Sequence, residues 1–291
     1  MIALLADSNA LENPVLRSYL EASRDHVVLL SDLVLIEMRK KRALSTSRGS
    51  LRIVASRPSQ MYLLRPTHEV VAERIASSAD ATALFDFPGT IELEGVARAL
   101  GVLPTPAGLA EYMVEAEKGA AWQFETLRQE VIDLEPAMIK LVGEFSASEV
   151  SRIRRFQPVD EATKRKVWEL LKDTTRDSIV RNQLPPKGYK LGIRDAMGMF
   201  AFRYALCIMI YYLNWVADGS TVKKLDRRVN DVIDLQIAAM ATFFNGVLSM
   251  DKQVRSVSQG ARAALRNFGS FVGDDWTPAG ALVTADSAQL P

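Results

Sequence analysis

Two residue types that build many structural and catalytic sites are nearly absent from this chain. It contains one cysteine, Cys207, and two histidines, His26 and His68. A disulfide within the chain is therefore impossible, which suits a reducing compartment, and we expect a cytoplasmic location. Two histidines are too few for a histidine-based metal site. A metal centre in this protein would have to use oxygen ligands.

Net charge and long apolar runs are also lacking. The formal net charge is +1 at pH 7, so no global field attracts nucleic acid and any basic surface must be local. The longest uncharged apolar run, Tyr204–Ala217, has 14 residues and is too short to span a bilayer. We interpret the surrounding stretch, Ile193–Asp218, as a buried core or dimer helix and expect no membrane association. Met1 leads directly into a strand pattern, so no signal peptide is expected.

Apolar runs near the N-terminus predict strands, and acids follow the first two. Ile2–Ala6 is typical of a central strand, and Asp7 ends it. Val27–Leu30 is a second such run, followed by a helix pattern over Leu33–Arg42. Glu37 is the one acid inside that helix pattern, and a carboxylate on an apolar face needs a partner or a metal.

A second group of acids lies late in the chain. Residues 228–241 predict a nearly all-apolar, buried helix. Asp231 and Asp234 lie near its start, one turn apart, where the helix dipole favours carboxylates. After a turn, Val247–Ser249 predicts a short strand with Asp251 just past its carboxyl end. Open α/β sheets bind ligands at the carboxyl ends of their strands, so up to three carboxylates are expected in one crevice.

Together these acidic segments resemble the PIN-domain nucleases. The matching segments are ADSNAL with Asp7, SDLVLIEM with Glu37, DLQIAAMA with Asp234, and LSMD with Ser249 and Asp251. The family pattern is an Asp ending the first strand, a Glu on a following helix, an Asp opening an Ile-Ala-Ala helix, and Ser/Thr-x-Asp after the last core strand. All four occur in order, and the resemblance covers residues 1–65 and 220–255. It implies an α/β fold with a PIN-like parallel sheet flanked by helices.

The separation between Glu37 and Asp234 is far longer than in compact members of that family, so we expect an all-helical insertion. The expected parts are 1–84, the first part of the PIN-like core; 85–189, the insertion; 190–255, the second part of the core; and 256–291, a C-terminal tail. The last dozen residues should be disordered or loosely docked. Trp122, Phe124 and Trp168 are expected to pack on each other or on a second copy of the chain. Within the first part, Gln60–Leu64 predicts a third strand and Thr67–Ser77 a helix.

The resemblance also implies the chemistry of the site. Asp7, Glu37, Asp234 and Asp251 would be the catalytic residues, and close carboxylates repel one another unless a cation neutralises them. Oxygen ligands select Mg²⁺ or Mn²⁺. Asn9 and Ser249 would support the carboxylates or orient water. Asp231 is either a further metal ligand or a helix N-terminal charge. The alternative for the whole set is that these acids serve only capping and the helix dipole.

A basic segment follows the glutamate helix. Seven basic residues and no acids lie between Arg39 and Arg57, namely Arg39, Lys40, Lys41, Arg42, Arg48, Arg52 and Arg57. One interpretation is a nucleic-acid-binding rim beside the acidic crevice, to which we assign the first six. The other is a solvated helix face, which is the usual meaning of a charged run.

The predicted function is that of a metal-dependent endoribonuclease. The same site could cleave DNA, because nothing in these residues reads the 2′-hydroxyl. A regulatory or nucleic-acid-binding module with little activity, controlled by a partner, is the alternative of another class. Expected partners are nucleic acid, RNA before DNA, a second copy of the chain, and a protein inhibitor or operon partner of the kind found in toxin–antitoxin or defence systems.

Overall fold

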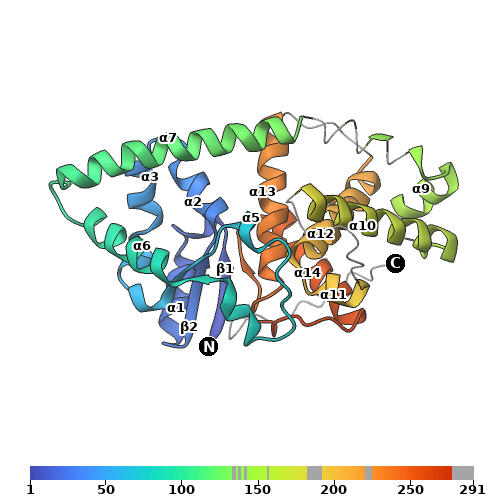
Figure 1. Ribbon diagram of the computed structural model, residues 1–291, viewed down its shortest axis with the longest axis horizontal. Coiled ribbons are helices and arrows are strands. Elements are labelled where there is room, and N and C mark those ends of the chain that lie inside the picture. The colour runs from blue at the N-terminus through green and yellow to red at the C-terminus, as the bar shows by residue number, and fades with distance from the viewer. Residues whose placement is uncertain are drawn as a thin grey trace.

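The computed structural model describes residues 1–132, 136, 139–140, 143–155, 157–181, 192–219 and 225–276. They form an α/β structure around a five-stranded sheet with the strand order β4-β3-β2-β1-β5 (Figure 1). The strands are β1 (Ile2–Ala6), β2 (His26–Leu30), β3 (Met61–Leu64), β4 (Phe85–Asp86) and β5 (Val247–Leu248). β2 is buried along its whole length, as expected of a central strand covered on both faces.

One strand departs from the predicted parallel sheet. β1 pairs in parallel with β2 and β5, and β2 with β3, whereas β4 runs antiparallel to β3. A parallel connection requires a crossover element, usually a helix. Between β3 and β4 the chain forms only the short helix α5 (Thr67–Val70) and the 3-10 turn η3 (Asp80–Leu84), and it doubles back so that Arg65 N donates to Leu84 O at 2.9 Å. The sheet is therefore mixed.

Backbone pairing between distant segments shortens two predicted helices. The helix predicted over Thr67–Ser77 ends at Val70, because Ile75 N donates to Gly198 O at 2.9 Å. The same contact divides the helix predicted over Ile193–Asp218 into α11 (Ile193–Met197) and α12 (Phe200–Ala217). A side chain at Gly198 would meet the Ile75 carbonyl oxygen at 3.1 Å, so this close approach favours glycine.

The helices that surround the sheet come from the first hundred residues and from the end of the chain. They are α1 (Pro14–Ala22), α2 (Asp32–Arg39), α3 (Ala43–Ser50), α4 (Arg52–Ala55), α6 (Phe87–Leu100), α13 (Leu225–Ala241) and α14 (Lys252–Asn267), with the 3-10 turns η1 (Ser8–Ala10), η2 (Pro58–Gln60) and η3 (Asp80–Leu84). Asn13 and Ser31 cap α1 and α2 by accepting from Val15 N and Val34 N. β4 and α6 belong to the sheet layer, since Thr90 Oγ1 accepts from Leu63 N at 2.9 Å, although both lie in the range assigned to the insertion.

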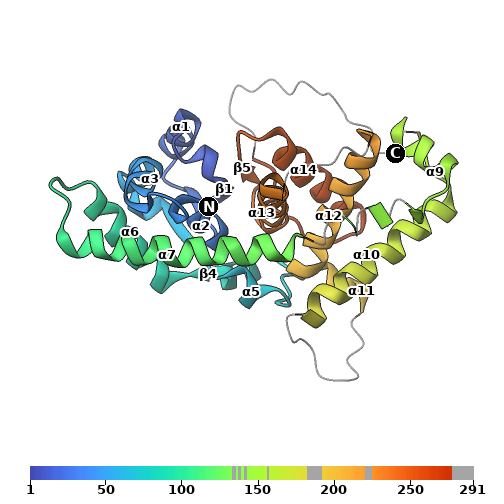
Figure 2. The ribbon, with the colours of Figure 1, turned by 90° about the horizontal axis from the view of Figure 1, so that it is seen from above.

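The described residues between 107 and 181 include three helices and no strand, namely α7 (Ala107–Glu130), α9 (Ala147–Arg154) and α10 (Glu161–Arg181). They do not form one layer. α7 runs along α2 and α3 and reaches α13, whereas α9 and α10 pack on α12 at the other end of the molecule (Figures 1 and 2). Trp168 accordingly packs edge-on against Phe202 and Phe268 and not on the predicted aromatic partners, while Trp122 is 70% exposed.

The most apolar helix, α12, is long and apolar enough to cross a membrane by length and composition, but 61% of that window is buried inside the molecule. It packs against α9, α10, α13 and α14, which agrees with its interpretation as a core helix. The C-terminal region is better packed than expected, because α14 buries Val257, Ala261 and Leu265. The last dozen residues, expected to be loosely docked, lie outside the described residues.

A buried arginine joins α12 to the C-terminal segment. Arg203 is 0% exposed, and burial lowers its pKa to about 9. Its guanidinium donates to Thr242 Oγ1 at 3.0 Å, to Phe271 O at 2.6 Å and to Met197 O at 3.2 Å, and it lies 3.7 Å from the Phe243 ring centroid. These bonds connect three segments that are far apart in the chain.

We predict that Arg203→Met destabilises the protein by about 2–4 kcal/mol, because buried acceptors lose their donors. Urea unfolding followed by circular dichroism measures this change. Arg165→Met, at an exposed position of α10, should change the free energy of unfolding by no more than about 0.5 kcal/mol. Equal stabilities of the two variants would contradict the role given to Arg203.

Candidate functional site

A cavity of about 360 Å³ lies beyond the carboxyl ends of β1 and β5. It is lined by Asp7, Ser8, Asn9, Glu37, Arg227, Asn230, Asp231, Asp234, Asp251 and Gln253. The structure thus brings all five predicted carboxylates to one cavity, together with Asn9. They come from η1 and its N-cap just after β1, from α2, from α13 and from the N-cap of α14. No described residue of α7, α9 or α10 contributes to the lining.

Asp7 is the most deeply placed carboxylate, with 2% of its surface exposed. Ser249 Oγ donates to its Oδ2 at 2.6 Å, and Asn9 Nδ2 donates to the same oxygen at 2.7 Å. Burial raises the pKa of Asp7, although the bonds from Ser249 and Asn9 act in the opposite direction. Ser249 and Asn9 therefore hold the Asp7 carboxylate in one orientation, and the Ser249 hydroxyl proton is used in its hydrogen bond to Asp7.

Glu37 is the carboxylate with a cation beside it. Ser8 Oγ donates to Glu37 Oε2 at 2.6 Å, and Lys40 Nζ lies 3.9 Å from Oε1. Burial raises the pKa of Glu37 and lowers that of Lys40. The Lys40 ammonium also lies 4.1 Å from the Phe124 ring centroid, so α7 holds this cation in place.

Asp231 accepts hydrogen bonds from two neighbouring helices. It was predicted near a helix start, but α13 begins at Leu225, so Asp231 lies beyond the first turn, where the dipole has little effect. Its carboxylate accepts from Tyr211 Oη at 2.8 Å and from Gln253 Nε2 at 3.3 Å. These bonds tie α13 to α12 and α14. Asp231 therefore has a structural role in addition to its place in the lining of the cavity.

Asp234 is the carboxylate that lacks a hydrogen-bond donor among the described residues. It lies on the third turn of α13 and accepts no hydrogen bond from any residue that the structure describes. Burial, and then the negative charges of Asp7, Glu37, Asp251 and Asp231 in decreasing order, raise the pKa of Asp234 to about 8. Near neutral pH this group therefore holds a proton unless a cation replaces it.

Asp251 combines two features. It lines the cavity, and it is also the N-cap of α14, with Oδ1 accepting from Gln253 N at 2.6 Å. Its backbone N–H donates to Ser249 Oγ at 3.0 Å, which links it to the Asp7 carboxylate. The capping alternative therefore holds for Asp251 in part, while its remaining oxygen stays available.

The chemistry of these donors fits a hard divalent cation. Every candidate ligand is a carboxylate, and three of them, Asp7, Glu37 and Asp234, have raised pKa values that a nearby cation would lower. Among the described residues, no three acidic, histidine or cysteine side chains already converge as a coordination set. Asp7, Glu37 and Asp231 accept hydrogen bonds from side chains of the protein instead. A cation would have to draw them from these donors.

The basic segment was predicted to form a nucleic-acid-binding rim beside the acidic crevice. None of its residues lines the cavity, although Lys40 Nζ lies 3.9 Å from Glu37 Oε1. Helix α7 packs over part of the segment, and the Arg39 guanidinium lies 6.0 Å from the Tyr112 ring centroid. Arg48 donates to Leu100 O at the end of α6 and to Thr105 Oγ1 before α7. Lys40 lies under Phe124, as described above. Lys41, Arg42 and Arg52 are exposed.

Four lining residues were missed by sequence reasoning, namely Arg227, Asn230, Ser8 and Gln253. A signal was present for the first two. They precede Asp234 by seven and four positions, which places them on the same face of a helix. Gln253 had no such signal, because its position depends on how α14 packs beside α13.

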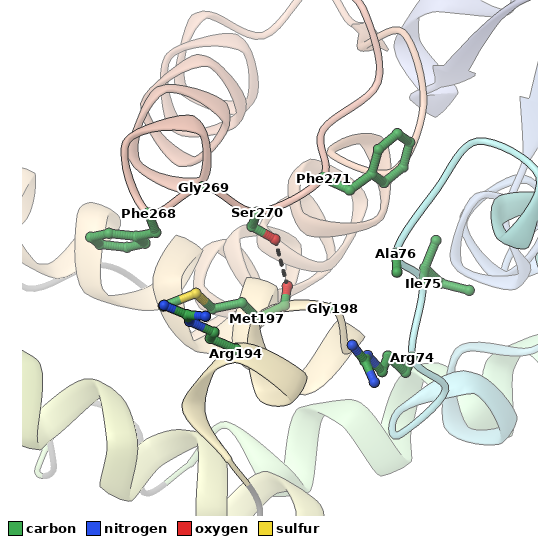
Figure 3. A pocket seen from close by; sticks show the side chains of 10 residues that line it. All are labelled: Arg74, Ile75, Ala76, Arg194, Met197, Gly198, Phe268, Gly269, Ser270 and Phe271. Atoms are coloured by element: carbon green, nitrogen blue, oxygen red, sulfur yellow. Dashed lines mark hydrogen bonds between the residues drawn. The ribbon is translucent and has the colours of Figure 1, made fainter.

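A second cavity of about 360 Å³ lies between the 74–76 segment, α11 and the residues that follow α14 (Figure 3). Two exposed arginines, Arg74 and Arg194, lie at its edge, and Arg74 is paired with Asp195 at 2.9 Å. The Ser270 hydroxyl donates to the Met197 carbonyl at 3.4 Å. Its lining holds no acid or histidine that would act as a general base, so the carboxylate cavity is the candidate site.

Comparison with protein-family models, with curated proteins and with solved structures finds no match to this chain. The function must consequently be inferred from the residues of the cavity themselves.

The raised pKa of Asp234 predicts how the stability of the metal-free protein depends on pH. The folded-state pKa, about 8, exceeds the unfolded value of 3.8, so the folded protein binds more protons between these limits. The contribution of Asp234 to stability should be fully present at low pH and should be lost as pH rises toward 8, and the raised pKa values of Asp7 and Glu37 act in the same direction. A tenfold difference in the acid dissociation constant of a group between the folded and unfolded states changes the free energy of unfolding by about 1.4 kcal/mol. This corresponds to about 2–4 °C in Tm.

Thermal unfolding in EDTA at pH 5.5 and pH 8 measures this effect. We expect Asp234→Asn to reduce the difference in Tm between the two pH values, because the variant has no proton to lose there. A divalent cation should raise Tm of the original protein at pH 8 more than at pH 5.5, since it binds the ionised carboxylates. An unchanged pH dependence in Asp234→Asn would show that Asp234 ionises normally.

Proposed function

We propose that this protein is a metal-dependent nuclease that hydrolyses phosphodiester bonds, with RNA as the leading substrate. One observation carries the proposal. Asp7, Glu37, Asp234 and Asp251 come from distant parts of the chain and line one cavity, where burial and mutual repulsion raise the pKa of Asp234 to about 8. Such perturbed groups in a cleft are typical of functional sites. The resemblance of the four acidic segments to PIN-domain nucleases supports the same conclusion.

The residues of the chain would divide the work as follows. Asp7, Glu37, Asp234 and Asp251 would hold Mg²⁺ or Mn²⁺, which supplies charge neutralisation and a more acidic bound water. Ser249 and Asn9 hold the Asp7 carboxylate in one orientation through Oδ2. Asp231 keeps α12, α13 and α14 in register through Tyr211 and Gln253.

Several further properties belong to the same proposal. DNA is the alternative substrate for this cavity. A binding or regulatory module controlled by a partner is favoured by one observation, namely that α7 covers Arg39 and Lys40 of the basic segment. Nucleic acid binding would then use the exposed Lys41, Arg42 and Arg52. A cytoplasmic location, self-association, and an inhibitor of the toxin–antitoxin or defence type complete the proposal.

A cleavage assay tests the proposal directly. Purified protein is incubated with labelled RNA and DNA, single-stranded and duplex, in Mn²⁺, in Mg²⁺ and in EDTA. We expect metal-dependent cleavage that Asp7→Asn reduces more than about 100-fold, because the neutral amide keeps the shape of the side chain but not its charge. Asp177→Asn, which removes an exposed carboxylate of α10, is the matched control and should retain full activity.

Two outcomes would contradict the proposal. One is a folded Asp7→Asn protein that cleaves as fast as the original, which would exclude the site. The other is a protein that binds nucleic acid but cleaves nothing with any divalent cation, which would favour the binding module.

A further inference from the structure

The cavity contains one cation among many acids. Of the ten residues that line it, five are carboxylates and one, Arg227, carries a positive side chain. Even with one divalent cation bound, the ionised cavity would have a net negative charge. A phosphodiester entering it would be repelled unless another cation faced its oxygens.

Arg227 is placed to be that cation. It lies on α13, where Arg227, Asn230, Asp231 and Asp234 follow one another at the spacing of a single helix face. Its side chain is exposed and makes no hydrogen bond or ion pair with any described residue. Its neighbour Asp226 is engaged by Arg128 of α7 at 3.5 Å, so the nearest acid along the chain has another partner.

The other cations near the cavity are already committed. Lys40 is held between Glu37 and the Phe124 ring. Arg255 Nη1 donates to Ser249 O at 2.7 Å, and this bond supports the turn that carries Asp251. Arg39 and Arg48 pack against α7 and the residues before it. The cation that a substrate meets at the cavity is therefore on α13 and not in the basic segment.

We propose that Arg227 binds a non-bridging phosphate oxygen of a polynucleotide beside the carboxylates and so selects phosphodiester substrates at this site. The inference rests on the proposed function, which it deepens by naming a phosphate-binding residue. The guanidinium presents two parallel N–H groups to a phosphate, an arrangement that lysine does not reproduce. A cavity of about 360 Å³ has the size of small-molecule sites, which fits one nucleotide unit of a single strand better than a duplex.

The test combines binding and cleavage by the full chain. Binding of a labelled single-stranded RNA is measured by fluorescence anisotropy in Ca²⁺, over a series of salt concentrations. Arg227→Gln should weaken binding about 5- to 10-fold and reduce the slope of log K against log salt by about 0.7, the value for one lost phosphate contact. Arg165→Gln removes an equally exposed charge from α10 and should change neither. Arg227→Lys should restore the slope but not the full kcat/KM of cleavage in Mn²⁺.

The outcomes separate the two proposals. If the original protein cleaves RNA and Arg227→Gln matches Arg165→Gln in salt slope and in kcat/KM, the role of Arg227 is overturned while the nuclease stands. If the protein cleaves nothing but Arg227→Gln alone flattens the salt slope, the nuclease fails and the phosphate-binding role stands. If the protein binds neither RNA nor DNA at any salt concentration, the role of Arg227 is overturned as well. The Tm of each variant should lie within about 1 °C of that of the original protein, so that a loss of binding or cleavage reflects the removed charge and not unfolding.

Discussion

The burial of several carboxylates in one cavity is the constraint on which this structure depends. Like charges in a region of low dielectric repel strongly. In this fold, most of the carboxylates are stabilised by hydrogen-bond donors of the protein. Asp7 has Ser249 and Asn9, Glu37 has Ser8 and Lys40, and Asp231 has Tyr211 and Gln253. The bond from Ser249 to Asp7 also joins β5 to β1 across 242 positions of the chain. The hydrogen bond that orients the Asp7 carboxylate therefore also connects the two strand ends at this edge of the sheet.

Because β5 pairs with β1, the middle of the chain leaves the sheet after β4 and α6 and returns to form α13 and β5. Its helices take two different surfaces on the way, since α7 lies on α2 and α3 while α9 and α10 lie on α12 (Figure 2). The consequence for function is electrostatic. Phe124 and Tyr112 pack over Lys40 and Arg39, which leaves both cations only partly exposed, and the one positive side chain in the lining of the cavity comes from α13.

Local patterns were enough for the central strands and for the convergence of the acids. The apolar runs before Asp7 and before Glu37 fix β1 and β2, and parallel strands bring their carboxyl ends to one edge. What failed depended on contacts between distant segments. The antiparallel β4, the break at Gly198 and the bond from Tyr211 to Asp231 have no signature within a window of a few residues. The packing of α7 over part of the basic segment could not be predicted for the same reason, because that helix begins about 50 residues later.

A count of acids would not by itself distinguish a functional site from ordinary structural use. The cap of α14 explains Asp251, and the bond from Tyr211 explains Asp231. Asp234 has no such explanation among the described residues, because it is half-buried without a donor and lies near four other carboxylates. An asparagine there would avoid the repulsion, so the aspartate destabilises the metal-free protein. A half-buried carboxylate without a donor, which does not stabilise the fold, is expected where function requires it. At Asp234 the function that accounts for it is the binding of a cation by a negative charge.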